Sequence, residues 1–184
     1  EQACKAQGLA DVYVATDDAR IFDHVSGFGG KVILTSNAHP SGTDRILEVA
    51  EKMPDFDAYI NIQGDEPYID PQQIDQVCEI LRSRSGAFVG TLVKRLTDLN
   101  ELQNPNTIKA VFALDGQAIY FSRSPIPHVR DATQEAEFLQ ERGYFKHIGI
   151  YGYSKEGLSR IRGMQRGMLE KAESLEQLRW MEHG

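Results

Sequence analysis

Short apolar runs alternate along the chain with longer segments of mixed polarity. The runs at residues 12–15, 31–34, 58–62 and 87–93 have the length and composition of buried strands. Between them, three segments place apolar residues at helical spacing, one running from Asp17-Asp18 toward Phe28 and the others at residues 46–53 and 71–82. This alternation predicts an α/β fold in which helices flank a mostly parallel sheet.

Capping residues mark where these helices begin. Asp17 and Asp18 give the first helix an acidic N-terminus, Ser41 or Thr43 precedes the second, and Asp70 stands before Pro71 at the start of the third. Side chains of this kind accept hydrogen bonds from the free backbone N–H groups of a first helical turn. The helix boundaries are therefore supported by chemistry as well as by periodicity.

The second half of the chain has a different pattern. Two β-rich runs, 108–113 and 118–121, flank the turn signal Asp115-Gly116, which predicts an antiparallel hairpin inserted into the sheet. A polar segment at Asp131 to Glu141 is expected to be a mobile or peripheral helix, followed by a strand at 145–153 and a final helix at 169–183. Together these features predict one domain, residues 1–184, with a mixed sheet.

Composition and charge narrow the functional classes. The chain has 184 residues, 41% of them hydrophobic and 26% charged, and a formal net charge of −7. An acidic chain does not favour a nucleic-acid-binding role through a broad basic face. No apolar run approaches the length of a membrane span, so a cytoplasmic protein without membrane insertion is expected. Cys4 and Cys78 lack metal-type spacing and are predicted to be reduced fillers.

Ligands of open α/β sheets bind beyond the carboxyl ends of the strands, and this rule selects the loop Gln63 to Pro67. It follows the strand at 58–62, where Gly64 permits close backbone approach while Asp65 and Glu66 offer oxygen ligands suited to Mg²⁺. The alternative is that Asp65 only caps a turn before Pro67, since Gly, Asp and Pro also dominate turns.

The loop His39 to Arg45 combines Ser41, Gly42 and Arg45 at the start of a helix. Free amides, a hydroxyl and a guanidinium in such a place suit a nucleotide base or phosphate. An ordinary capped helix with solvated charges explains the same residues. The trio Thr16, Asp17 and Asp18 has the same two interpretations.

Polar residues of the second half form a further candidate group. Arg123 ends a strand before two prolines and could meet an acidic ligand through a bidentate guanidinium. His147 lies within a strand, where a structural hydrogen-bonded histidine is the alternative. Glu170, Glu173 and Gln177 fall on one stripe of the expected final helix, which could bind hydroxyl groups or simply be a solvated face.

Seven segments in order carry a resemblance over nearly the whole chain. They are VATDD (14–18), HPSGTDR (39–45), NIQGDEP (61–67), NPNTIKAV (104–111), IYFSRSPIP (119–127), KHIGIYGY (146–153) and LEKAESLEQLR (169–179). Together they resemble the 3-deoxy-manno-octulosonate cytidylyltransferases, or CMP-Kdo synthetases. The resemblance implies a nucleotidyltransferase domain of the nucleotide-diphospho-sugar transferase (Rossmann-like) type. Such enzymes join CTP to the sugar acid Kdo for lipopolysaccharide synthesis, use Mg²⁺, act in the cytoplasm and form homodimers.

The resemblance also assigns roles residue by residue. It implies that Asp65 is a magnesium ligand and, with Arg123, a catalytic residue. The nucleotide-binding residues it implies are Thr16, Asp17, Ser41, Gly42 and Arg45, and the sugar-binding residues are Gln63, Arg123, His147, Glu173 and Gln177. Because the match in the last segment is uncertain by a helical turn, Glu170 and Glu176 remain further sugar-binding candidates.

Two segments typical of this family do not occur among these residues. One is a basic, glycine-containing loop after a first strand, which holds the triphosphate, and the other is a later VDTPEDL-type segment whose aspartate completes the metal site. We therefore expect a domain truncated at both ends and inactive by itself. Two alternatives remain, a cytidylyltransferase acting on a sialic-type acid and a nucleotide-sugar-binding module without catalysis.

Overall fold

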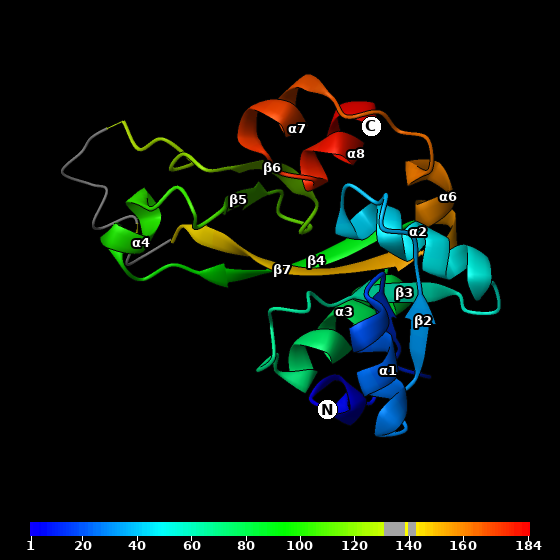
Figure 1. Ribbon diagram of the computed structural model, residues 1–184. Helices are drawn as coiled ribbons and strands as arrows, with labels where there is room; N and C mark the ends of the chain where they lie inside the picture. Colours follow the sequence, from blue (N-terminus) through cyan, green and yellow to red (C-terminus); the bar gives the residue numbers. More distant parts are fainter. Residues whose placement is uncertain (131–138, 140–142) are drawn as a thin grey trace. The chain divides into compact units, whose positions relative to one another are not determined.

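The computed structural model describes residues 1–130, 139 and 143–184, and it confirms the α/β class. The chain divides into two compact units. Unit 1 comprises Glu1–Thr91 and Gly149–Arg162, and unit 2 comprises Leu92–Ile148 and Gly163–Gly184 (Figure 1). The helix expected at Asp131 to Glu141 lies, apart from Leu139, outside the described residues.

Unit 1 begins with a short helix–strand element and a parallel strand pair. A 3₁₀ turn, η1 (Ala3–Lys5), precedes β1 (Val14–Thr16), which pairs in parallel with β2 (Val32–Leu34). Helix α1 (Ala19–Gly27) connects the two strands and lies beside them, as Figure 1 shows. Because both strands run in the same direction, the loops that follow Thr16 and Leu34 meet at one edge.

The rest of unit 1 is built from α2 (Gly42–Lys52), β3 (Ala58–Asn61), α3 (Pro71–Ser83) and α6 (Lys155–Ile161). The predicted caps are confirmed, since Asp18, Ser41 and Asp70 each accept a hydrogen bond from the first turn of their helix. Ile74 and Val77 of α3 are fully buried, so this helix covers β3 with an apolar face. Helix α6 was not predicted.

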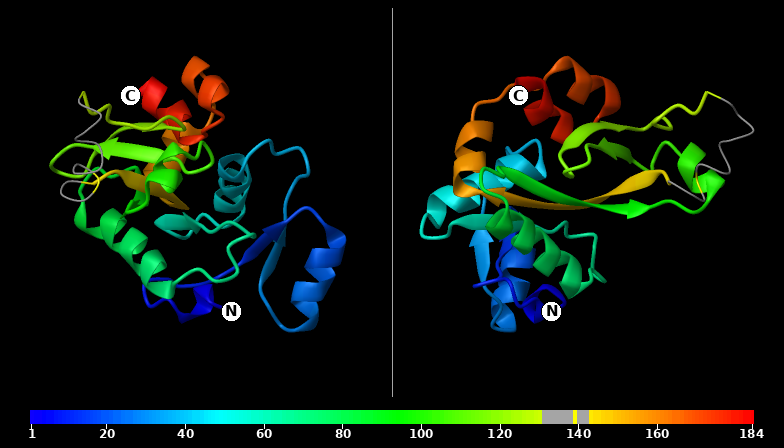
Figure 2. Two further views of the ribbon diagram at one scale, coloured as in Figure 1. Left: turned by 90° about the vertical axis from the view of Figure 1, so that its left-hand side faces the viewer. Right: turned by 180° about the vertical axis from the view of Figure 1, so that it is seen from behind.

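Unit 2 contains the predicted hairpin. Strands β5 (Lys109–Phe112) and β6 (Ala118–Ser122) pair antiparallel around the turn at Gly116, whose positive φ of 88° suits glycine. Helix α4 (Leu99–Gln103) precedes them, and α7 (Met168–Glu173) and α8 (Gln177–His183) cover them through buried Leu175 and Leu178 (Figure 2). Strands β4 (Val89–Arg95) and β7 (Phe145–Ser154) contribute residues to both units.

The strand directions correct the expectation of a mostly parallel sheet. Among the described strands, β1 and β2 form a parallel pair, whereas β3–β7, β5–β6 and β5–β7 are antiparallel. The second sheet has the order β3-β7-β5-β6, with β4 also pairing with β7. The long strand β7 causes the difference, because it runs against both β3 and β5.

The single final helix predicted at 169–183 is wrong. The backbone turns left-handed at Ser174 (φ 52°, ψ 47°), and this residue ends α7 before α8 begins. A left-handed residue cannot continue an α-helix, so the regular stripe expected for Glu170, Glu173 and Gln177 does not form. The three side chains instead have three different environments.

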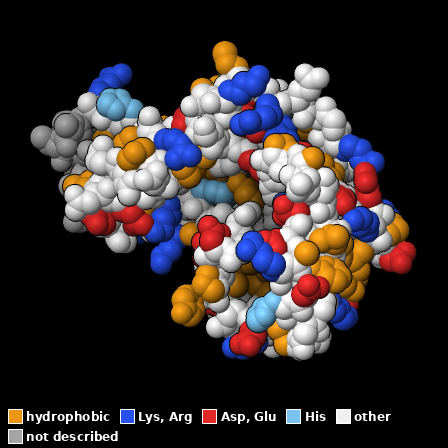
Figure 3. All heavy atoms as spheres, viewed as in Figure 1, with side chains coloured by type: hydrophobic (Ala, Val, Ile, Leu, Met, Phe, Trp, Pro, Cys, Tyr) orange, Lys and Arg blue, Asp and Glu red, His pale blue; other side chains and the backbone are white. Residues whose placement is uncertain are grey.

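Charged side chains of both signs lie on the surface (Figure 3), as expected for a chain in which 26% of the residues are charged. On the face shown in Figure 3, Lys and Arg side chains are interspersed with Asp and Glu side chains. Within the described part of the chain, no helix has the length and apolar character that crossing a membrane requires.

Candidate functional site

Arg45 in the first turns of α2 contacts two loops of unit 1. Its Nη2 lies 2.9 Å from the Asp17 carboxylate, which follows β1. Its Nη1 donates to the hydroxyl of Thr35, which follows β2. The structure therefore brings together Asp17 and Arg45, two residues predicted from separate loops, at the edge where the parallel strands end.

Thr16 and Asp18 have local roles beside this ion pair. Thr16 is buried, and its Oγ1 accepts the backbone N–H of Asp18 at 3.1 Å. Asp18 caps α1 by accepting the N–H of Arg20 at 2.8 Å. The capping interpretation is thus correct for Asp18, while Asp17 is directed toward Arg45.

The N-terminus of α2 lies close to the end of β3. Ser41 caps the helix, and its hydroxyl donates to the Asp44 carboxylate. A Cβ atom added to Gly42 would lie 3.0 Å from Nδ2 of Asn61 and 3.4 Å from Nε2 of Gln63. A larger residue here would have to displace these two side chains slightly, and the predicted residues Ser41, Gly42 and Gln63 lie close together.

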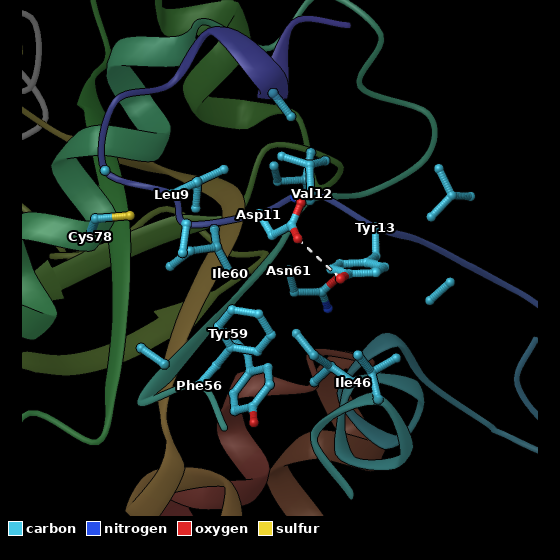
Figure 4. A pocket seen from close by; sticks show the side chains of 18 of the residues that line it. Leu9, Asp11, Val12, Tyr13, Ile46, Phe56, Tyr59, Ile60, Asn61 and Cys78 are labelled. Atoms are coloured by element: carbon cyan, nitrogen blue, oxygen red, sulfur yellow. Dashed lines mark hydrogen bonds between the residues drawn. The ribbon is translucent and has the colours of Figure 1, made fainter. Parts of the chain in front are cut away.

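A groove of about 1110 Å³ adjoins this group within unit 1. Apolar residues before and within β1, in α2 and in β3 line most of it, together with Gly42, Arg45 and Gln63. Nδ2 of Asn61 is buried and is the one such side-chain nitrogen or oxygen without a hydrogen-bond partner in the described residues. Figure 4 shows the Asn61 side chain among the lining residues, with Tyr13, Tyr59 and Ile46 around it in this view. The predicted nucleotide side of the site thus borders a large opening, and Asn61 was missed by the sequence reasoning.

Two further residues of α2, Glu48 and Lys52, bind the loop between β2 and α2. The carboxylate of Glu48 accepts the Ser36 N–H at 2.9 Å and also contacts His39 Nε2. Lys52 Nζ lies 2.7 Å from Glu48 and donates to the Leu34 carbonyl at 2.7 Å. Hydrogen bonds from Lys52, His39 and Ser36 lower the pKa of Glu48 to about 2.

The loop after β2 is therefore held by hydrogen bonds to three residues on one face of α2, namely Arg45, Glu48 and Lys52. Their spacing of three and four residues was visible in the sequence, but a solvated face has the same pattern. Glu48 and Lys52 are positioning residues that the sequence reasoning missed.

Asp65 lies in an exposed turn after β3. The Glu66 N–H donates to the Gln63 carbonyl at 3.1 Å, and Gln63, Asp65 and Glu66 are all exposed. The described residues contain no group of three or more His, Cys, Asp or Glu placed to hold a metal. Asp65 and Glu66 alone do not form a complete metal site. They fit Mg²⁺ in the usual arrangement in which one or two carboxylates bind the ion and water and nucleotide phosphates supply the other ligands.

Glu173 joins the end of α7 to the end of β6 in unit 2. Its Oε1 accepts the Ser122 hydroxyl at 2.6 Å and its Oε2 accepts the Arg123 backbone N–H at 2.9 Å. The side chain of Arg123 donates to the Glu173 carbonyl at 2.6 Å and to the Pro105 carbonyl at 3.0 Å. Arg123 and Glu173, both predicted sugar-binding residues, are thus in direct contact.

Lys109 in β5 belongs to the same cluster and was not selected from the sequence. It is fully buried, and its Nζ donates to the Asn104 carbonyl at 3.0 Å. Burial lowers the pKa of this ammonium, while the negative charge of Glu173 acts against that shift and the positive charge of Arg123 adds to it. A lysine within a strand usually points to solvent, so its residue type did not indicate burial. Its place in the motif NPNTIKAV was the one sequence feature that could have selected it.

His147 lies in β7 with its ring edge-on to Phe121, at 5.1 Å between ring centroids. Burial lowers the pKa of His147 to about 4. The ring is therefore neutral near pH 7, where it can donate one hydrogen bond and accept another.

The remaining candidates separate after the break at Ser174. Glu170 is buried and bonded to Arg179 at 2.9 Å and to Arg166 at 2.9 Å. Burial raises its pKa, but hydrogen bonds from Arg179 and then Arg166 outweigh this effect, so the pKa is lowered. Gln177 is buried at the start of α8, and half-buried Glu176 precedes it. The ion pairs give Glu170 a structural role.

Known proteins share the sequence pattern and the fold of this chain. Residues 1–184 match the family model described as cytidylyltransferase. The chain belongs to the cytidylyltransferase family. Among curated members, a 3-deoxy-manno-octulosonate cytidylyltransferase of Thermodesulfovibrio yellowstonii is 44% identical over 100% of this chain and 74% of its own length. The enzyme of the same name from Cytophaga hutchinsonii is 45% identical over 100% of this chain and 73% of its own.

A solved cytidylyltransferase structure has the same fold. It is a CMP:2-keto-3-deoxy-manno-octonic acid synthetase complexed with CTP, with a TM-score of 0.90 and 43% sequence identity. The match covers 100% of this chain and 72% of that chain. The resemblance to the CMP-Kdo synthetases is therefore confirmed.

Proposed function

We propose that this cytidylyltransferase joins CTP and Kdo to give CMP-Kdo and pyrophosphate. The observation that carries the proposal is the convergence of the loops after β1 and β2 on Arg45 of α2 in unit 1, in a chain whose relatives bear this activity in their names. The parallel β1–β2 pair, with ligand loops at its carboxyl ends, also supports a fold of the nucleotide-diphospho-sugar transferase type.

The nucleotide is assigned to unit 1. The N-terminus of α2 offers backbone N–H groups and a partial positive charge, and Arg45 adds a guanidinium to the same edge. Gly42 has no side chain of its own, so the side chains of Asn61 and Gln63 can approach this end of the helix. Thr16, Asp17 and Ser41 shape the loops around the position assigned to CTP.

The acidic sugar is assigned to the Arg123 cluster of unit 2, and Gln63 of unit 1 stays a predicted sugar-binding residue. Arg123 carries the charge that suits the carboxylate of Kdo, while His147, Glu173 and Gln177 suit its hydroxyl groups. In the reaction the anomeric hydroxyl of Kdo attacks the α-phosphorus of CTP, and pyrophosphate leaves. The chain contributes by holding the two substrates in line and by stabilising negative charge.

Asp65 is the residue we assign to Mg²⁺. When bound, the ion draws charge from phosphate oxygens and orients them. The exposed turn leaves the Asp65 carboxylate accessible for this purpose. We further propose a cytoplasmic homodimer in lipopolysaccharide synthesis, in line with the family resemblance.

The test is synthesis of CMP-Kdo by the full-length enzyme. We expect pyrophosphate release with CTP and Kdo, and none with a sialic acid in place of Kdo. Asp65→Asn should abolish turnover at any practical Mg²⁺ concentration while CTP still binds. Turnover with sialic acid instead would reassign the sugar, and an unchanged Asp65→Asn enzyme would refute the metal assignment.

A further inference from the structure

Lys109 is an unusual residue for the interior of unit 2. Its side chain is fully buried, although Lys109 is the first residue of β5 and pairs with Ser122, the last residue of β6. An ammonium removed from water loses much more solvation free energy than a neutral side chain does, so a buried lysine needs compensating partners. The cluster around it shows what these partners are and what they hold.

Two cations bind two consecutive carbonyl groups. Lys109 Nζ donates to the Asn104 carbonyl at 3.0 Å, and Arg123 Nη1 donates to the next carbonyl, that of Pro105, also at 3.0 Å. Asn104 and Pro105 are both exposed, so burial of their side chains does not hold the turn at 104–107 in place. Within the turn, the Thr107 N–H donates to the Asn104 carbonyl at 3.1 Å. Buried Lys109 thus holds the turn at 104–107, and the Arg123 guanidinium binds the same turn.

The charges of the cluster are unbalanced. Lys109 and Arg123 are positive, and Glu173 is the carboxylate that interacts with Lys109. Glu173 already accepts from the Ser122 hydroxyl and the Arg123 backbone. One positive charge therefore remains in excess, and a ligand that carries a carboxylate would balance it.

We propose that Lys109 is a positioning residue of the acidic-sugar site. It acts through the Asn104-Pro105 turn, which sets the guanidinium of Arg123 toward the sugar carboxylate, and its charge adds to the attraction for that carboxylate. Full burial prevents Lys109 itself from touching the sugar. The inference rests on the proposed function because it takes Arg123 as the residue that meets Kdo.

Steady-state kinetics of the full-length enzyme provide the first test. Lys109→Met keeps the length and apolar stem of the side chain but removes the charge and the donor. We expect the KM for Kdo to rise about tenfold or more, as for loss of one charged hydrogen bond, with the KM for CTP changed less than about twofold. The matched control is Lys146→Met, which removes the neighbouring cation of β7 that pairs with Glu101 on the half-exposed side. This control should leave both KM values unchanged.

Hydrogen exchange separates failure of this inference from failure of the proposed function. Whatever the substrate, Lys109→Met should speed amide exchange of Thr107, and Lys146→Met should not. Faster Thr107 exchange with no sugar-acid turnover by the wild type would overturn the proposed function but keep the role of Lys109 in the turn. Unchanged Thr107 exchange, or equal increases in both KM values, would overturn the inference. If Lys109→Met does not fold, Lys109→Gln, which retains a donor, is measured by the same criteria.

Discussion

The guanidinium of Arg45 lies 2.9 Å from the carboxylate of Asp17, although the two residues are 28 positions apart in the sequence. The pair joins the loop after β1 to the first turns of α2. Both side chains are partly exposed, at 25% for Arg45 and 39% for Asp17. Such an ion pair contributes little to folding, so the role we propose for it is to orient Arg45.

Asp17→Asn should therefore affect CTP binding more than stability. We expect the free energy of unfolding to fall by about 1 kcal/mol at most, because exposed ion pairs are weak. The Kd for CTP, measured by calorimetry, should rise several-fold as Arg45 loses one of its anchors. Asp23→Asn makes the same charge change on the exposed face of α1 and serves as the control. Equal effects of the two variants on CTP binding would argue against a role for the pair.

Gly42→Ala tests the close approach between α2 and β3. Alanine favours helix over glycine by about 1 kcal/mol, so the folded protein should not be destabilised by propensity. The added methyl would however press on Nδ2 of Asn61 and Nε2 of Gln63, at 3.0 and 3.4 Å. We expect CTP affinity to fall about tenfold through displacement of this edge, measured by calorimetry.

Gly27→Ala is the matched control for this substitution. Gly27 also lies in a helix, α1, and nothing stands within 4 Å of its added Cβ. It should raise the melting temperature slightly and leave CTP affinity unchanged. A Gly42→Ala protein with normal affinity would show that the edge adjusts freely and that Gly42 has no steric role.

Local signals in the sequence predicted a large part of this structure. Asp18, Ser41 and Asp70 were recognisable as caps because each can satisfy a free N–H of its own helix, a requirement that depends only on neighbouring residues. The hairpin at Gly116 was predictable for the same reason. Loops at the ends of parallel strands then identified Asp17 and Arg45 as partners in one region.

Features that depend on distant residues were not predictable in this way. The helix break at Ser174 interrupts a segment with regular helical spacing, and the carbonyl groups beside it accept hydrogen bonds from Arg123, about fifty residues earlier. The directions of β3 and β5 against β7 are likewise set by long-range pairing. Burial of Lys109 is likewise not predictable from neighbouring residues, since its side-chain chemistry alone suggests exposure.

Glu48 gives a prediction for acid stability. Its folded-state pKa is lowered to about 2 from an ordinary 4.5, chiefly by hydrogen bonds from Lys52 and His39. A lowered pKa means that the carboxylate stabilises the fold fully above about pH 4.5 and loses this effect as the pH falls toward 2. Glu48→Gln should therefore flatten the fall in melting temperature between pH 4.5 and the acid limit.

Glu51→Gln is the comparison for Glu48→Gln. Glu51 lies on the same helix but forms an exposed ion pair with Arg162. It should keep the wild-type acid profile, and thermal unfolding followed by circular dichroism from pH 3 to 7 distinguishes the two. Parallel profiles for wild type and Glu48→Gln would contradict the anchoring role assigned to Glu48.

His147 gives a pH dependence of the same direction as Glu48, but at higher pH. Burial lowers its folded-state pKa from 6.5 to about 4, so the unfolded chain binds a proton between these values and the folded chain does not. Stability should then decrease as the pH falls from about 6.5 to 4 and show no further loss from this residue below 4. His147→Gln should remove that component, while His183→Gln, at an exposed helix end, should retain it. Nuclear magnetic resonance of the ring protons offers a direct measurement, and a His147 midpoint near 6.5 would disprove the lowered pKa on which this prediction rests.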